Sequence, residues 1–118
     1  MTLPNLPLAS LTPGFDSLLL TDPAGSIFYA NAAFRSLTGY TLESVMGKSP
    51  RLLQGAGTDA RVLERLSTSM KEGGTFEGKA INYKSDSTPF IMHWRVVPVK
   101  VDGAIVYWLA VQREAGSA

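Results

Sequence analysis

The C-terminal part of the chain alternates between polar and apolar residues, and this period of two restricts the fold more than any other feature. Three segments carry the pattern, residues 75–84, 89–100 and 104–113. The Asp102-Gly103 pair between the second and third segments favours a two-residue hairpin turn. The pattern therefore predicts three consecutive antiparallel strands.

The N-terminal part predicts two short strands followed by three helices. The strands are residues 18–21 and 26–29, and an Asp-Pro-Ala-Gly turn separates them. Each predicted helix begins at a side chain that can cap its first turn and ends at a glycine. The caps are Asn31, Thr41 and the Thr58-Asp59 pair, and the ends are Gly39, Gly47 and Gly73-Gly74.

The order β-β-α-α-α-β-β-β predicts an α+β fold, in which a five-stranded antiparallel sheet carries its helices on one face. Residues 1–14 are expected to form an irregular lead-in, because three prolines interrupt them. Residues 15–114 are expected to form the domain, and residues 115–118 a short tail. A chain of 118 residues is long enough for one such domain.

Composition excludes several classes of function. The formal net charge is +1 and the basic residues are dispersed among acids, so we expect no nucleic-acid partner. The chain has no cysteine, which excludes disulfides and thiolate metal sites, and no metal site is expected. No apolar run is long enough to span a bilayer, so no membrane association is expected and a soluble cytoplasmic protein is the default.

Strand alternation predicts which side chains face the helices. Asn82, Met92 and Gln112 point inward, together with Trp94 and Trp108. A buried amide without a partner costs about 1–3 kcal/mol. Asn82 and Gln112 therefore bond either the polar edge of a ligand or one another, backbone groups or water. The methionine and the two tryptophans favour a core that fills itself.

The opposite face of the last three strands is expected to be apolar and exposed in a single chain. Such a surface usually marks an interface, so we expect a homodimer through this outer sheet face. The only histidine, His93, lies on the same face, which disfavours a haem site between helices and sheet. The apolar residues of this face are Ile91, Val97, Ile105, Tyr107, Leu109 and Val111.

Several motifs, in this order, resemble a PAS domain over roughly residues 15–114. They are residues 27–34, residues 37–40, the loop at 47–55 and the strand–turn–strand at 82–90. The loop, Gly-Lys-Ser-Pro-Arg-Leu-Leu-Gln-Gly, is similar to the flavin-cradling loop of LOV photoreceptor domains. The resemblance implies the fold described above and a non-enzymatic sensory module.

The LOV resemblance implies a flavin site that lacks the reactive residue. Arg51, Gln54, Asn82 and Gln112 match LOV contacts to flavin. Pro50 stands where LOV domains carry the cysteine that adds to the flavin in light, so no cysteinyl adduct can form. The other departures are Ser49 for the loop asparagine, Met92 for the second asparagine and Ser67 for the second phosphate-binding arginine.

Arginines near the loop offer a phosphate site or a solvated surface. A phosphate held by Arg51 with Arg61 or Arg65 would suit a flavin nucleotide. Arginines near the start of a helix are also common on solvated surfaces. The sequence leaves both interpretations open.

Two functions follow from these observations. One is a sensor that holds FMN or FAD as a redox or light chromophore; the alternative is a ligand-free PAS domain for dimerisation or protein interaction. An enzyme is not indicated, because no nucleophile, metal cluster or carboxylate pair stands at chemical spacing. The ending at Ala118 fits either a sensor excised from a larger protein with an effector domain or a short module that acts as a dimer.

Overall fold

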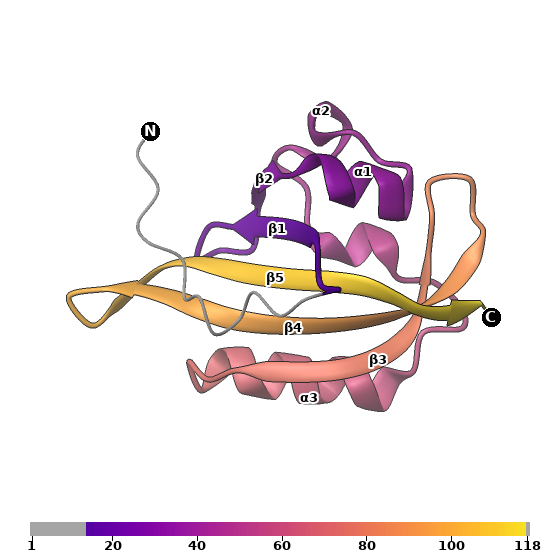
Figure 1. The fold of residues 1–118 in the computed structure, drawn as a ribbon. Helices are drawn as coiled ribbons and strands as arrows, with labels where there is room; N and C mark the ends of the chain where they lie inside the picture. The colour runs from indigo at the N-terminus through magenta and orange to yellow at the C-terminus, as the bar shows by residue number, and fades with distance from the viewer. Residues whose placement is uncertain (1–13, 118) are drawn as a thin grey trace.

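The computed structural model describes residues 14–117, and its central element is a five-stranded antiparallel sheet (Figure 1). The strand order is β2-β1-β5-β4-β3, so the first and last strands of the chain lie side by side in the sheet. The predicted five-stranded α+β fold is confirmed. The strands are β1 Ser17–Thr21, β2 Ile27–Ala30, β3 Phe76–Tyr83, β4 Pro89–Val101 and β5 Ala104–Ser117.

Four helical segments connect β2 to β3, and a side chain caps each of them. Asn31, Thr41 and Asp59 cap the three predicted helices, as expected. The fourth segment is a single 3-10 turn that the sequence did not predict, capped by Ser49 with Pro50 in its first position. The segments are α1 Ala32–Thr38, α2 Leu42–Val45, η2 Pro50–Leu53 and α3 Ala60–Lys71.

The helices cover one face of the sheet and define the main core. Phe34 of α1, Val45 of α2 and Leu53 of η2 are buried against inward residues of the strands. Helix α3 contributes partly buried side chains, including Leu66 and Met70, to the same cluster. The inner face of the sheet and the helices therefore enclose the space in which the predicted site lies.

The outer face of the sheet is less open than the sequence predicted. Leu109, Val111 and Val97 are only 0%, 1% and 7% exposed, so the prediction that they are exposed in a single chain is wrong. Phe15, just before β1, belongs to the same apolar cluster, and Tyr107 is half-buried against it. This cluster gives the sheet a second, smaller core on the side away from the helices.

Two bulges in β4 and β5 change the predicted alternation. One lies between Val99 and Lys100, which pair with Tyr107 and Ile105 respectively. The extra residue turns Ile105 toward the helices, where it packs against the main core, so its predicted outward position is wrong. Strand β5 also continues to Ser117, four residues beyond the predicted end at residue 113.

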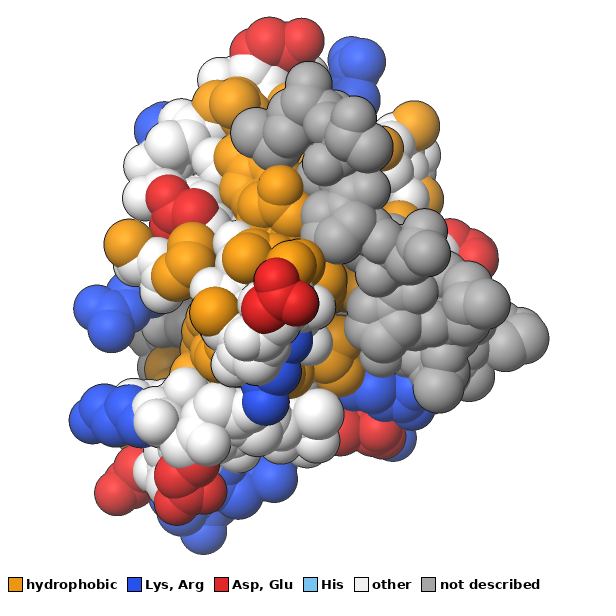
Figure 2. All heavy atoms as spheres, turned by 90° about the vertical axis from the view of Figure 1, so that its left-hand side faces the viewer, with side chains coloured by type: hydrophobic (Ala, Val, Ile, Leu, Met, Phe, Trp, Pro, Cys, Tyr) orange, Lys and Arg blue, Asp and Glu red, His pale blue; other side chains and the backbone are white. Residues whose placement is uncertain are grey.

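Charged groups are mixed on the end of the molecule shown in Figure 2. Acidic and basic side chains alternate around that view, and apolar side chains lie between them. Within residues 14–117, no helix is both long and apolar enough to cross a membrane. Residues 1–13, which include most of the predicted lead-in, lie outside the described residues.

Candidate functional site

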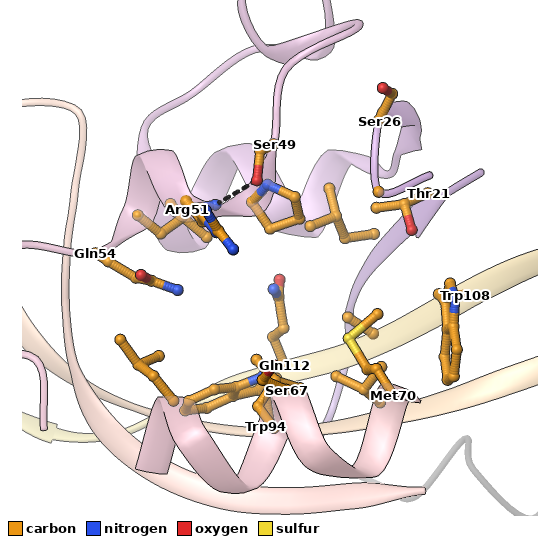
Figure 3. Close-up of a pocket in the computed structure, with 18 of the residues that line it drawn as sticks. Thr21, Ser26, Ser49, Arg51, Gln54, Ser67, Met70, Trp94, Trp108 and Gln112 are labelled. Carbon is orange, nitrogen blue, oxygen red and sulfur yellow. Dashed lines mark hydrogen bonds between the residues drawn. The ribbon is translucent and has the colours of Figure 1, made fainter. Parts of the chain in front are cut away.

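A cavity of about 850 Å³ lies between the helices and the inner face of the sheet (Figure 3). Small-molecule sites usually occupy about 300–1,000 Å³, so the volume suits a ligand of cofactor size. All of the predicted site residues contribute to its wall. They are Ser49, Pro50, Arg51, Gln54, Asn82, Met92, Trp94, Trp108 and Gln112.

The sheet side of the cavity follows the predicted inward register. Trp94 and Gln112 are direct neighbours across β4 and β5, and Asn82 and Met92 lie further along the same face. Each of these side chains is buried. Trp94 and Trp108 stand on the cavity wall and leave its volume open, so the tryptophans do not fill the core as the self-filled alternative expected.

The two buried amides have one protein partner each. Gln112 Oε1 accepts a hydrogen bond from Ser17 Oγ at 2.9 Å. Asn82 Nδ2 donates to Met92 Sδ at 3.5 Å, a contact to a weak acceptor. Within residues 14–117, Asn82 Oδ1 and Gln112 Nε2 have no hydrogen-bond partner. The wall therefore offers a ligand one acceptor and one donor on side chains that are largely buried.

The loop side of the cavity is held in place by hydrogen bonds to β3. Gly57 N donates to Tyr83 Oη at 2.8 Å, and Thr58 Oγ1 donates to Ile81 O at 2.7 Å. The Tyr83 ring lies so close to Gly55 that a side chain at this position would collide with it. These contacts fix the loop that carries Gln54.

Loop and sheet residues face one another across the open space. Figure 3 shows Ser49, Arg51 and Gln54 on one side and Trp94 and Gln112 on the other. Ser49 Oγ accepts from Arg51 N at 3.2 Å, which fixes the start of η2. The chain thus places a cation and two amides around one cavity.

The arginines of α3 do not join Arg51. Arg61 pairs with Asp59 at 3.2 Å, and its guanidinium lowers the pKa of that carboxyl chiefly through a side-chain hydrogen bond. The Arg65 guanidinium lies over the Phe76 ring, 5.3 Å from the ring centre. Neither arginine lines the cavity, so of the two interpretations left open by the sequence the structure favours a solvated surface for Arg61 and Arg65.

Lys71 is the cation of α3 that lines the cavity, and the sequence reasoning missed it. It follows Ser67, another wall residue, by four positions and therefore lies on the same helix face. That spacing was visible in the sequence. Ser67 stands where the LOV resemblance implies a second phosphate-binding arginine. Lys71, one helical turn later, places a positive charge on the same helix face.

Thr21 was also missed. Its side chain lines the cavity and is 6% exposed. In the part of the chain that the structure describes, its hydroxyl is the single buried side-chain polar atom recorded without a hydrogen-bond partner. No local sequence signal distinguishes this threonine, because the partners of a hydroxyl depend on the packed structure.

His93 lies on the outer face, as predicted, within a charged cluster. Its Nε2 lies 3.0 Å from Glu77 Oε2, and Arg113 Nε donates to its Nδ1 at 3.1 Å. The bond with His93, followed by that with Arg95, lowers the pKa of Glu77. Among the described residues no cluster of three or more histidine, aspartate or glutamate side chains could hold a metal ion.

The chain is similar to a known family and to several curated proteins. A family model described as a PAS domain matches residues 16–115. Phototropin-1A of Oryza sativa subsp. japonica is 38% identical over 95 residues, which are 80% of this chain and 10% of that protein. A blue-light-activated histidine kinase of Brucella anthropi is 35% identical over 88 residues, which are 72% of this chain and 18% of the kinase. The chain thus spans under a fifth of either relative.

Solved structures share the fold at similar identity. The dark structure of the blue-light photoreceptor Aureochrome1 LOV matches with a TM-score of 0.88 and 28% identity, over 98% of this chain and 88% of that chain. A second structure, from work on a flavin analogue and the mechanism of a light-oxygen-voltage domain, matches with a TM-score of 0.82 and 29% identity. That match covers 85% of this chain and 77% of the other.

Proposed function

Because this chain belongs to the PAS domain family and is LOV-like within it, we propose that it is a sensory module that binds a flavin, FMN or FAD, and forms no cysteinyl adduct. The observation that carries the proposal is the cavity wall, where the largely buried side chains of Asn82 and Gln112 leave Oδ1 and Nε2 without a hydrogen-bond partner among the described residues. The pyrimidine edge of a flavin carries both donors and acceptors and would complement such a pair. A bound flavin would supply blue-light absorption and redox chemistry.

The residues around the cavity divide into ring-binding and phosphate-binding groups in this proposal. Asn82, Gln112 and Gln54 would bond the polar edge of the ring. Arg51 and Lys71 are the cations on the cavity wall and would attract the phosphate. Pro50 lines the cavity and has neither a thiol nor a transferable proton, and no cysteine occurs elsewhere in the chain.

Gln112 connects the cavity to the first strand. It bonds Ser17, its register partner in β1, through the side-chain amide oxygen. The Ser17 hydroxyl can either donate or accept, so it can follow a rotation of the Gln112 amide. A change in hydrogen bonding inside the cavity would thereby alter contacts at the start of β1 and provide an output without an adduct.

An absorption spectrum of the purified chain tests the proposal. We expect a yellow protein whose chromophore is released on denaturation and identified as FMN or FAD by chromatography. A colourless preparation that also takes up neither nucleotide on reconstitution would contradict flavin binding. A Gln112→Leu variant, which removes one of the two buried amides, should retain less chromophore than the parent.

The alternative is a ligand-free PAS domain that serves dimerisation or docking to an effector. One observation favours it, since Asn82 and Gln112 each already have one protein partner. The homodimer proposed for the outer face has less apolar surface than expected, because Leu109 and Val111 are buried in the single chain. Sedimentation of the colourless protein as a dimer would support this alternative, and a monomer would oppose it.

A further inference from the structure

The outer face of the sheet carries a cluster of charged side chains around the ring of Phe15. Phe15 lies just before β1, is 7% exposed and belongs to the smaller core. The guanidinium groups of Arg95 and Arg113 lie over its ring, 5.2 Å and 5.3 Å from the ring centre. The His93 ring contacts it edge to face, with 4.7 Å between the ring centres. Strands β4 and β5 therefore hold the residue that leads into β1.

The hydrogen bonds of His93 require a neutral imidazole ring. Arg113 Nε donates to His93 Nδ1 at 3.1 Å, and a guanidinium group can only donate. His93 Nδ1 is therefore an acceptor without a proton, and the single ring proton is on Nε2. There it points to Glu77 Oε2, 3.0 Å away, while Glu77 Oε1 accepts from Arg95 Nε at 2.9 Å. The partners of the two ring nitrogens thus fit one tautomer of the neutral ring.

A second proton on His93 would break one of these contacts. The new Nδ1–H group would face the Arg113 Nε–H group, so that two donors and two positive charges would meet where a hydrogen bond of 3.1 Å now lies. The half-buried Arg113 side chain must then move away, whereas the contact with Glu77 gains charge. The same guanidinium lies over Phe15, so its withdrawal removes one of the two cations from that ring.

The charged groups around His93 come from three strands. Lys79 is its register partner on β3, and Glu77 of the same strand is the carboxylate that it contacts. Arg95 follows on β4 and pairs with Glu77, and Arg113 is the register partner of His93 on β5. Among these groups cations outnumber carboxylates, so a charged imidazole adds to an excess of positive charge. The His93 side chain is 13% exposed, which leaves a path for a proton from water.

We propose that the outer face is a proton-sensing site, in which protonation of His93 releases Arg113 and loosens the hold on Phe15. Imidazole is the side chain that ordinarily changes charge between about pH 5 and pH 8. Phe15 stands two residues before Ser17, whose hydroxyl bonds Gln112 in the cavity wall, and Arg113 follows Gln112 directly on β5. Acid thus acts on the same strands that line the cavity, whether or not a flavin is bound.

Urea denaturation of the full chain at about pH 8 and about pH 5.5 tests the proposal through a thermodynamic cycle. Phe15→Leu removes the ring but keeps an apolar side chain, so the factor by which it lowers the folding equilibrium constant measures the hold on the ring. We expect this factor to be about fivefold smaller at the lower pH, because Arg113 has then left the ring. The same factor at both pH values, within error, would overturn the proposal.

Control variants assign the effect to His93. The amide of His93→Gln can accept from Arg113 and donate to Glu77 but takes up no proton, so in this background the effect of Phe15→Leu should not depend on pH. A pH dependence that persists there would overturn the role of His93. Phe34→Leu, the same substitution in the main core, should cost the same at both pH values. The lower pH lies above the range in which Glu77 takes up its proton, since the bonds with His93 and then Arg95 lower the pKa of that carboxyl.

The bond between Arg113 and His93 can also be followed directly in the parent chain, which covers the case that Phe15→Leu does not fold. NMR should detect a scalar coupling from Arg113 Nε to His93 Nδ1 across the hydrogen bond at the higher pH. We expect the coupling to disappear at the lower pH. Its persistence at the lower pH, or its absence at both, would contradict the proposed release of Arg113.

Discussion

Asn82 Nδ2 donates to Met92 Sδ across a distance of 3.5 Å, so this amide donor of the cavity wall is bound to a weak acceptor. Asn82 is 4% exposed and Met92 1% exposed. A thioether competes poorly with a carbonyl for an amide hydrogen. A ligand carbonyl can therefore displace the sulfur at little cost, which makes Asn82 a sensitive position for a test of binding.

Replacement of Asn82 by leucine should weaken flavin binding. Loss of the ring contact is expected to cost about 1–3 kcal/mol, measured by equilibrium titration of the flavin-free chain. Ile81→Val changes the neighbouring residue, which faces away from the cavity, and should bind as the parent does. Unchanged binding in a double Asn82→Leu, Gln112→Leu variant would show that the site lies elsewhere.

Introduction of a thiol at position 50 should create adduct chemistry that the parent lacks. Pro50 lines the cavity, and the LOV resemblance of the loop predicts that it stands at the position of the reactive cysteine. Illumination of flavin-loaded Pro50→Cys should reversibly remove the long-wavelength flavin band, whereas Pro50→Ser should not respond in this way. The appearance of the same reversible species in the parent would refute the assignment, since the chain has no cysteine.

Replacement of Leu109 by arginine should unfold the protein more readily. Leu109 is 0% exposed in the single chain, so the charge would be buried without a partner. We expect a loss of about 3 kcal/mol or more in the free energy of unfolding, measured by urea denaturation. Val101→Arg is the control, because Val101 is 45% exposed in the neighbouring strand and the change should be within about 0.5 kcal/mol. Equal stability of the two variants would contradict the burial of the outer face.

Replacement of Asn31 by alanine should loosen the junction between α1 and β1. The Asn31 Oδ1 accepts from Leu18 N at 2.9 Å and from Phe34 N at 3.1 Å, and Nδ2 donates to Asp16 O at 2.8 Å. We expect a loss of about 1–3 kcal/mol in urea denaturation. Asn31→Asp keeps the two acceptor contacts and should lose less; an equal loss would mean that the cap contributes little.

Glu77 should make stability depend on pH in the acid range. Its pKa is lowered by the bond with His93 and then by that with Arg95, so the folded chain holds the carboxylate more strongly than the unfolded chain. This contribution is present above the unfolded pKa of about 4.3 and is lost as the pH falls through the lower folded value. Below that pH, the free energy of unfolding of Glu77→Gln, measured by urea denaturation, should change less with pH than that of the parent. Asp86→Asn serves for comparison. The pKa of the Asp86 carboxyl is lowered by hydrogen bonds with Thr88, so Asp86 should make its own contribution to the pH dependence of the free energy of unfolding.

The sequence by itself determined the five strands, three of the four helical segments and the inward wall of the sheet. Caps such as Asn31 and Asp59 act within one helical turn, and the inward positions of Asn82 and Gln112 follow from the period of a strand. Both signals are local, so they can be recognised in a short stretch of sequence without reference to the rest of the chain. The strand–helix order and the LOV-like loop then led to the same cavity that the structure shows.

Only the tertiary structure decided which side chains on each face of the sheet are buried and which have hydrogen-bond partners. The burial of Leu109 depends on residues such as Phe15 that come from a distant part of the chain. The inward turn of Ile105 depends on a bulge against β4, and the lack of a partner for the Thr21 hydroxyl depends on which groups the packed chain brings near it. Alternation predicts the side of a sheet on which a residue lies, whereas burial and hydrogen-bond partners result from contacts between segments that are far apart in sequence.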